Sequence, residues 1–100
     1  MYNIENMNRI LRILESSLDY PTVDFERIDP ETFGITKARR DGYLAVLEKK
    51  GFITGIHTIR WADGAVKIDF SDISITFEGL EYLESLEKKH HRERAFNLPN

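Results

Sequence analysis

Two helix-boundary signals separated by a single residue constrain this chain more than any other feature. Gly34 follows an Asp-Pro-Glu segment in which Asp29 suits an N-cap, and glycine is the usual left-handed terminator of a helix. Thr36 then suits the cap of the next helix, which we expect to run to about Lys50 and to end at Gly51. Two helices joined by so tight a turn are typical of a helix-turn-helix arrangement.

Hydrophobic periodicity predicts two further helices. Asn3 suits the cap of a first helix, which should end before Pro21 because proline lacks a backbone donor. Its apolar stripe, with spacings of three and four, comprises Ile4, Met7, Leu11, Leu14 and Leu18. Thr76 suits the cap of a last helix whose apolar residues recur every three positions.

Alternating and β-branched residues predict three strands and one extended arm. Residues 23–25 alternate between apolar and polar and suggest one short strand. Residues 52–61 suit a second strand, and the Asp-Gly within residues 62–65 is a strong hairpin signal. A third strand returns over residues 66–70, and residues 72–75 form an extended arm.

The expected order is therefore helix, short strand, helix, helix, two-stranded hairpin and helix. This order predicts an α+β fold of the winged helix-turn-helix type, in which the hairpin is the wing. A chain of 100 residues can bury one core and not two. We expect one domain over residues 1–90, followed by a flexible C-terminal tail at residues 91–100.

Two runs of residues resemble a known family. The stretch from Gly-Ile-Thr at 34–36 to Leu-Glu-Lys-Lys-Gly-Phe-Ile-Thr-Gly at 47–55 is similar to the recognition helix and first wing strand of many winged-helix proteins. The run Ile-Thr-Phe-Glu-Gly-Leu-Glu-Tyr-Leu at 75–83 looks like their closing helix. Together they resemble the YjcQ-like family of small bacterial and prophage winged-helix proteins, over most of residues 4–87. The wider winged-helix class contains both transcription regulators and interaction modules.

Basic charge is concentrated in the helix that would enter a DNA groove. Residues 36–50 carry five Lys or Arg side chains and two acidic ones, although the whole chain has a net charge of −3. In helix-turn-helix proteins the N-terminal residues of the second helix meet base edges. We therefore predict a regulator that binds double-stranded DNA. The expected contacts are Thr36, Lys37, Arg39 and Arg40 on the helix, with Arg60 and Lys67 on the hairpin.

A regulator of this kind would act as a homodimer, because symmetric operators offer two half-sites. The first helix, with Ile10 and Ile13 beside its main stripe, or the last helix with its tail would supply the interface. Against DNA binding, Asp41 and Glu48 on the outer helix face would repel phosphate. The core stripe also passes through Arg40, so that its stem can lie over the core and only its head can reach the edge.

Small residues line another side of the same helix. Ala38, Gly42 and Ala45 are spaced by four and three and permit close approach of another backbone. The partner could be a duplex, a second protein or a helix of this chain, and the internal helix crossing is the interpretation that we favour.

The alternative function is a protein interaction module on a winged-helix scaffold without DNA binding. The acidic isoelectric point, near 5.6, and the aromatic residues Tyr43 and Trp61 motivate it. Trp61, beside the wing turn, either folds onto the domain, which we favour, or stands exposed as a contact anchor.

The sequence lacks the residues that several classes of function require. The chain has no cysteine, no glycine-rich phosphate loop and no catalytic constellation. The neighbours His90 and His91 point about 100° apart on a helix and cannot form an i,i+4 metal pair. No apolar run approaches the roughly 20 residues that span a bilayer. We expect a non-enzymatic cytoplasmic protein without catalytic residues, cofactor, metal or membrane partner.

Overall fold

The computed structural model describes residues 3–97 and is of the α+β class, as predicted. Its helices are α1 (Ile4–Ser16), α2 (Pro30–Phe33), α3 (Lys37–Lys49) and α4 (Phe77–Asn97), with two 3-10 helices, η1 (Ser17–Asp19) and η2 (Phe25–Ile28). Its strands are β1 (Ile53–Thr54), β2 (His57–Arg60), β3 (Val66–Asp69) and β4 (Ser74–Ile75). They form two small antiparallel sheets, one from β1 and β4 and the other from β2 and β3.

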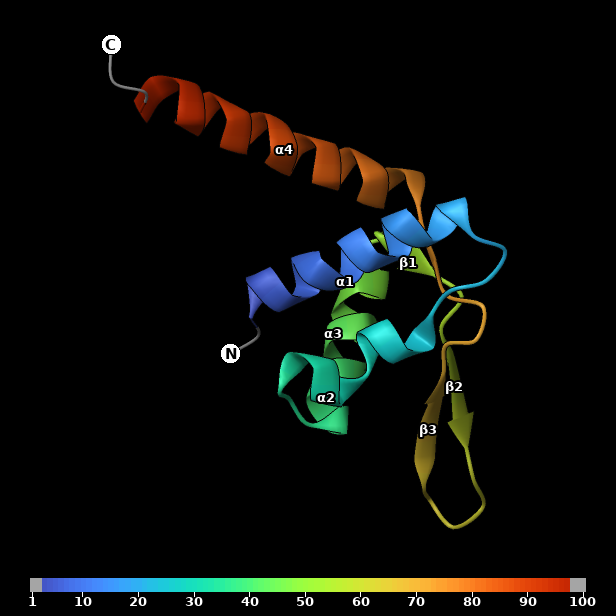
Figure 1. Cartoon of the computed structure of the whole chain (residues 1–100). Coiled ribbons are helices and arrows are strands. Elements are labelled where there is room, and N and C mark those ends of the chain that lie inside the picture. Colours follow the sequence, from blue (N-terminus) through green and yellow to red (C-terminus); the bar gives the residue numbers. More distant parts are fainter. Residues whose placement is uncertain (1–2, 98–100) are drawn as a thin grey trace.

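The core lies where α1 meets α3 and α4, and the β2–β3 hairpin projects away from it (Figure 1). The core contains Met7, Ile10, Leu11, Ile13, Leu14, Ile28, Tyr43, Leu44, Leu47, Ile53, Ile73, Ile75 and Leu83. Ile10 and Ile13 are thus buried inside the domain. They cannot supply the dimer interface that the sequence suggested for them.

The first helix ends earlier than its apolar stripe predicted. The hydroxyl groups of Ser16 and Ser17 donate to the carbonyl oxygen of Ile13 at 3.0 and 2.7 Å. Such bonds offer the backbone an alternative to helix continuation. The chain turns into η1, and Leu18 is 58% exposed instead of extending the buried stripe.

The short strand expected at residues 23–25 is absent, and that prediction is wrong. Asp24 instead caps η2, where its side chain accepts a hydrogen bond from the backbone N–H of Glu26 at 3.2 Å. A strand needs a partner for its backbone groups, whereas this cap satisfies them locally.

The two glycine signals around α2 and α3 are confirmed. Gly34 follows α2 with a φ of +65°, and Gly51 follows α3 with a φ of +79°. Between them, Thr36 caps α3 by accepting a hydrogen bond from the backbone N–H of Arg39 at 3.1 Å. These local signals set the tight connection between the two helices.

The strand expected over residues 52–61 is divided in two. Gly55 has a φ of +87°, and a Cβ atom there would overlap the carbonyl oxygen of Asp72. This bend gives β1 and β2 different partners. Of the arm expected at residues 72–75, Ser74 and Ile75 are extended and form β4, which pairs with β1, whereas Asp72 lies in a turn. The hairpin turn is confirmed: the N–H of Trp61 donates to the carbonyl oxygen of Ala65 at 2.8 Å.

The last helix lies beside α1 and continues well beyond it (Figure 1). Gly79 is buried where α4 crosses the chain at the start of β1, and a Cβ atom there would overlap the carbonyl oxygen of Phe52. The backbone of residues 91–97, assigned above to a tail, is helical as part of α4. Flexibility of the tail stays a prediction, and residues 98–100 lie outside the described part of the chain.

Candidate nucleic-acid interface

Helix α3 turns one face to the core and the opposite face to solvent. Arg40, Tyr43, Leu44 and Leu47 are buried. The exposed residues of this helix are Lys37, Ala38, Arg39, Ala45, Glu48 and Lys49. Thr36 is exposed too, but its hydroxyl oxygen is occupied as the helix cap. The predicted cations Lys37 and Arg39 are therefore on the surface.

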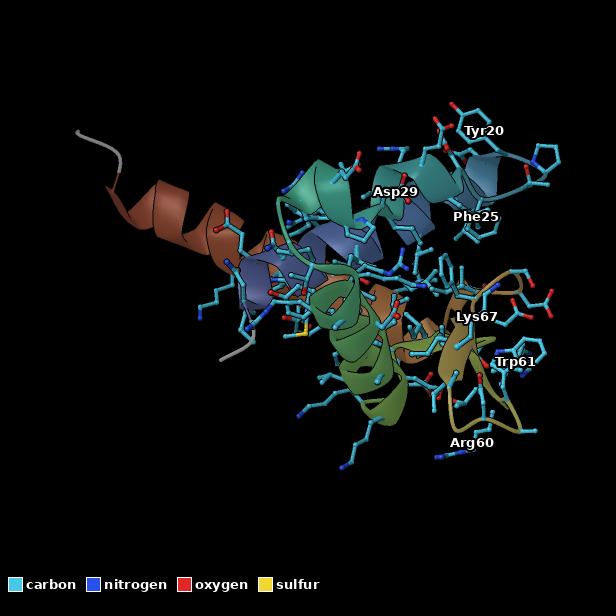
Figure 2. All side chains as sticks on the ribbon, turned by 90° about the horizontal axis from the view of Figure 1, so that it is seen from below. Tyr20, Phe25, Asp29, Arg60, Trp61 and Lys67 are labelled. Carbon is cyan, nitrogen blue, oxygen red and sulfur yellow. The ribbon has the colours of Figure 1, made fainter. Side chains whose placement is uncertain are left out.

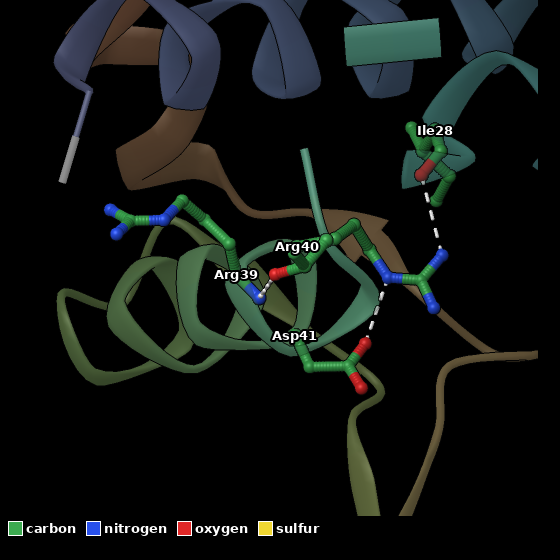
Figure 3. A network of polar contacts seen from close by, with 5 residues as sticks. Ile28, Arg39, Arg40 and Asp41 are labelled. Atoms are coloured by element: carbon green, nitrogen blue, oxygen red, sulfur yellow. Dashed lines mark hydrogen bonds and ion pairs between the residues drawn. The ribbon is translucent and has the colours of Figure 1, made fainter. Parts of the chain in front are cut away.

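Arg40, another predicted contact, is buried and serves the fold. It is 4% exposed, and its guanidinium donates to Asp41 at 2.8 Å and to the carbonyl oxygen of Ile28 at 3.3 Å (Figure 3). Its guanidinium carbon also lies 4.6 Å from the centre of the Phe70 ring. The head of this side chain is thus enclosed with its stem, and the structure removes Arg40 from the surface that meets solvent.

Tyr43, predicted above as a partner contact, is 1% exposed and belongs to the core. Its hydroxyl accepts a hydrogen bond from the backbone N–H of Asn3 at 3.3 Å. Burial raises the pKa of this hydroxyl, but hydrogen bonds from Asn3, Asn6 and Arg39 outweigh burial and hold the pKa below its usual value. Arg39 thus interacts with Tyr43 while its side chain is exposed. Tyr43 itself cannot be a surface anchor.

The small residues of α3 face solvent, not another helix. Ala38 and Ala45 are exposed and Gly42 is half-buried, so that the favoured interpretation of an internal helix crossing is wrong. Lys49 lies eleven residues after Ala38, which places it on the same side at about 100° per residue. Lys49 is not among the contacts predicted from the sequence, although its position on a helical wheel is a sufficient signal for it.

Arg60 and Lys67 leave opposite faces of the hairpin. Ile59 pairs with Lys67, and Arg60 pairs with Val66 in the next position of the ladder. Because successive residues of a strand alternate between faces, Lys67 shares a face with Ile59 and not with Arg60. Figure 2 shows the two cationic side chains pointing in different directions. The structure does not bring these two predicted contacts together.

Trp61 is exposed on the outer side of the hairpin. It is 57% exposed and points away from α3 (Figure 2), so that the favoured expectation that it folds onto the domain is wrong. Val66, near the same turn, is 55% exposed. The hairpin thus presents apolar as well as basic side chains to solvent.

The described part of the chain holds neither a cluster of metal ligands nor a membrane-spanning helix. Among those residues, no three His, Asp or Glu side chains gather where they could hold a metal ion. None of the described helices is both long and apolar enough to cross a membrane. The exposed cations of α3 and of the hairpin are therefore the candidate functional residues.

Comparison with protein families gave one match. The family model described as YjcQ protein matches residues 8–94, which is most of the chain. No curated protein and no solved structure matches it.

Proposed function

This chain belongs to the YjcQ family, and from that premise and the geometry of α3 we propose that it is a non-enzymatic winged-helix protein that binds double-stranded DNA as a transcription regulator. In this proposal α3 enters the major groove and the β2–β3 hairpin is the wing on the phosphate backbone. The carrying observation is the solvent face of α3, where small residues lie between exposed lysines.

The small stripe of α3 supports a close approach to a duplex. Ala38, Gly42 and Ala45 leave this side of the helix without bulky side chains, and Ala38 and Ala45 are exposed. The major groove of B-DNA is about 12 Å wide and admits an α-helix. A face of this kind lets the helix backbone approach the floor of the groove, while Lys37 and Lys49 reach the phosphates on either side.

The ion pair between Asp41 and Arg40 weakens one electrostatic argument against DNA binding. The sequence placed Asp41 and Glu48 on the outer face, where both would repel phosphate. In the fold, Asp41 is paired with Arg40 at 2.8 Å and its side chain is only 19% exposed. Among the described residues of α3, this leaves Glu48 as the exposed acid against Lys37, Arg39 and Lys49.

On the hairpin, Arg60 is the residue that we propose to contact the phosphate backbone. Its side chain is exposed at the end of β2, and it shares a hairpin face with Val66. Lys67 leaves the opposite face, and we therefore omit it, with the buried Arg40, from the proposed contact set. The set is Thr36, Lys37, Arg39, Lys49 and Arg60, with Thr36 acting as the cap that positions the helix N-terminus.

Salt-dependent binding tests the proposal. Fluorescence anisotropy of a labelled mixed-sequence duplex, titrated with protein to about 100 µM at low and moderate salt, covers the range of nonspecific dissociation constants, about 10⁻⁴–10⁻⁶ M. The double variant Lys37→Ala/Arg60→Ala should bind more weakly. Its slope of log affinity against log salt should be smaller by about 1.8, since each lost phosphate contact contributes roughly 0.9.

The matched control removes two exposed lysines from α4, as Lys88→Ala/Lys89→Ala, with the same change in net charge. It should keep the wild-type slope. If the control and the α3 variant lower the slope equally, binding follows net charge and this interface is wrong. No binding of wild-type protein at low salt would favour the alternative, a protein interaction module, whose remaining anchor is the exposed Trp61.

A further inference from the structure

Strand β2 has a free edge that faces solvent. All four of its residues are exposed, and its sheet contains only β2 and β3. The bond from Trp61 to Ala65 makes these two residues a hydrogen-bonded pair. Hydrogen-bonded pairs alternate along an antiparallel ladder, so that the next ones join Ile59 to Lys67 and His57 to Asp69. The backbone groups of the residues between them, Thr58 and Arg60, therefore point outward from the sheet.

The other edge of the hairpin is less open. Residues 67–71, which include Phe70, border a cavity of about 430 Å³, and its lining also includes Phe25, from the body of the domain, and Ile59 of β2. These two rings lie 5.7 Å apart, edge to face. A strand added along β3 would have to enter between the hairpin and η2, whereas the described residues leave the edge of β2 uncovered.

The open edge also carries apolar side chains. Ile59 is 37% exposed and Trp61 is 57% exposed, and both lie on the same hairpin face because they are two residues apart. Exposed strand edges with apolar residues are templates for pairing with another chain, and native proteins usually cover or charge them. On β2 the charge that limits such pairing is Arg60.

We propose that β2 pairs antiparallel with β2 of a second copy of this chain, about a two-fold axis at Ile59. In this register Ile59 lies opposite Ile59, Trp61 lies opposite His57, and Arg60 lies opposite Thr58. The outward-pointing backbone groups of Thr58 and Arg60 then form the hydrogen bonds between the two copies. The two hairpins become one four-stranded sheet.

The charge on Arg60 selects this register and favours a second copy as the occupant. The outward backbone groups could also pair about a two-fold axis at Arg60. That register places Arg60 opposite Arg60, and like charges directly opposite each other destabilise a strand pair. A two-fold axis at Thr58 instead places Trp61 opposite Gly55, which has no side chain to cover the Trp61 ring. The Ile59 register avoids both faults, and its contacts are isologous, as a two-fold dimer requires.

The proposed dimer goes beyond DNA binding and does not depend on it. The two-fold axis is perpendicular to the sheet, so that both Arg60 side chains remain on one face of the four-stranded sheet. Four-residue edges bury little area, and the dimer is therefore a weak one. The tests below contain no DNA, so that their failure leaves the DNA proposal intact, and failure of DNA binding leaves the dimer intact.

Disulfide trapping tests the register, since the natural chain has no cysteine. Ile59 opposite Ile59 is a non-hydrogen-bonded pair, whose Cα atoms lie about 4.5 Å apart, within the range that a disulfide bridges. Ile59→Cys should form a covalent dimer in a glutathione redox buffer at about 10 µM. Its yield should exceed that of Thr58→Cys, which keeps Arg60, and of the control Glu15→Cys, on exposed α1, by about tenfold. Equal yields for all three variants, or a higher yield for Thr58→Cys, would overturn the register.

Charge substitutions at Thr58 test the register independently, because a negative and a positive side chain there should change the dimer affinity in opposite directions. Thr58→Glu places two new carboxylates opposite the two Arg60 side chains, whereas Thr58→Arg places two cations there. Sedimentation velocity should show the dimer dissociation constant falling about fivefold for Thr58→Glu and rising about fivefold for Thr58→Arg. The same substitutions at Thr22, in an exposed loop, are the controls. A wild-type chain that stays monomeric up to about 1 mM, or equal effects of both Thr58 variants, contradicts the proposal.

Discussion

Arg40 places its guanidinium carbon 4.6 Å from the centre of the Phe70 ring, and this contact joins α3 to the end of the β2–β3 hairpin. The same group donates to the carbonyl oxygen of Ile28, just before α2, and to Asp41 on α3. One cation therefore connects α3 with η2 and with the end of the hairpin. This arrangement fixes how the hairpin sits relative to α3.

Loss of this cation should destabilise the whole domain. Arg40→Ala leaves the carbonyl oxygen of Ile28 without its partner and leaves the half-buried carboxylate of Asp41 uncompensated. We expect the free energy of unfolding to fall by roughly 1–3 kcal/mol, the range for buried polar groups that lose a partner. Urea unfolding followed by circular dichroism measures it.

Arg12→Ala is the control for that experiment, because Arg12 is an exposed arginine on α1. Its effect should stay within about 0.5 kcal/mol, as for most surface substitutions. A loss of stability in Arg40→Ala no larger than in Arg12→Ala would show that the buried network contributes nothing measurable.

Gly79→Ala should destabilise the domain, although replacing glycine by alanine usually stabilises a helix. An alanine in a helix interior is ordinarily more stable than glycine by about 0.8–1.0 kcal/mol. At Gly79, however, the added Cβ overlaps the backbone carbonyl oxygen of Phe52 and approaches the Ile75 side chain at 2.7 Å. We expect a net loss of about 1–3 kcal/mol, as for overpacked cores.

Thermal unfolding of Gly79→Ala beside Ser85→Ala, at an exposed position of the same helix, separates packing from propensity. The midpoint should fall for the first variant and stay close to the wild-type value for the second. A higher midpoint for Gly79→Ala would mean that α4 does not cross the chain as closely as described.

Asp69 should contribute a pH-dependent part of the stability. The backbone N–H of Ser71 donates to its carboxylate at 2.9 Å and, with the Ser71 hydroxyl, holds the pKa of Asp69 below its usual value. A carboxyl whose pKa is lower in the folded state stabilises the fold above its unfolded pKa, near pH 4. This stabilisation is lost as the pH falls through the folded pKa.

The nearly isosteric variant Asp69→Asn removes that titration. Compared with wild type it should be less stable at pH 7, and the difference should shrink toward zero as the pH falls below the folded pKa. Urea unfolding of both proteins between pH 2 and 7 supplies the measurement. A difference that is constant over this range would assign the effect to geometry instead of charge.

The boundaries of α2 and α3 were predictable because their causes are local. Gly34, Thr36 and Gly51 act on backbone groups within four residues of themselves, through a positive φ or a side-chain cap. The Asp-Gly turn of the hairpin is equally local. The family resemblance over the same residues was confirmed by the family model.

The candidate site was only partly predictable. Lys37 and Arg39 are exposed as expected, because the periodicity of α3 separates them from its core stripe. Arg60 and Lys67 fall on opposite faces because pairing register decides which face a residue takes, and register depends on the partner strand.

The sequence by itself determined where α1 and α4 begin, where α2 and α3 begin and end, that one hairpin projects, and that basic charge gathers on α3. Tertiary structure alone decided that residues 23–25 form no strand, that β1 pairs with β4, that Arg40 and Tyr43 are buried and that Trp61 is exposed. The physical reason is the range of the interactions. Caps and turns are satisfied by near neighbours, whereas strand pairing and burial depend on residues that only the folded chain brings together.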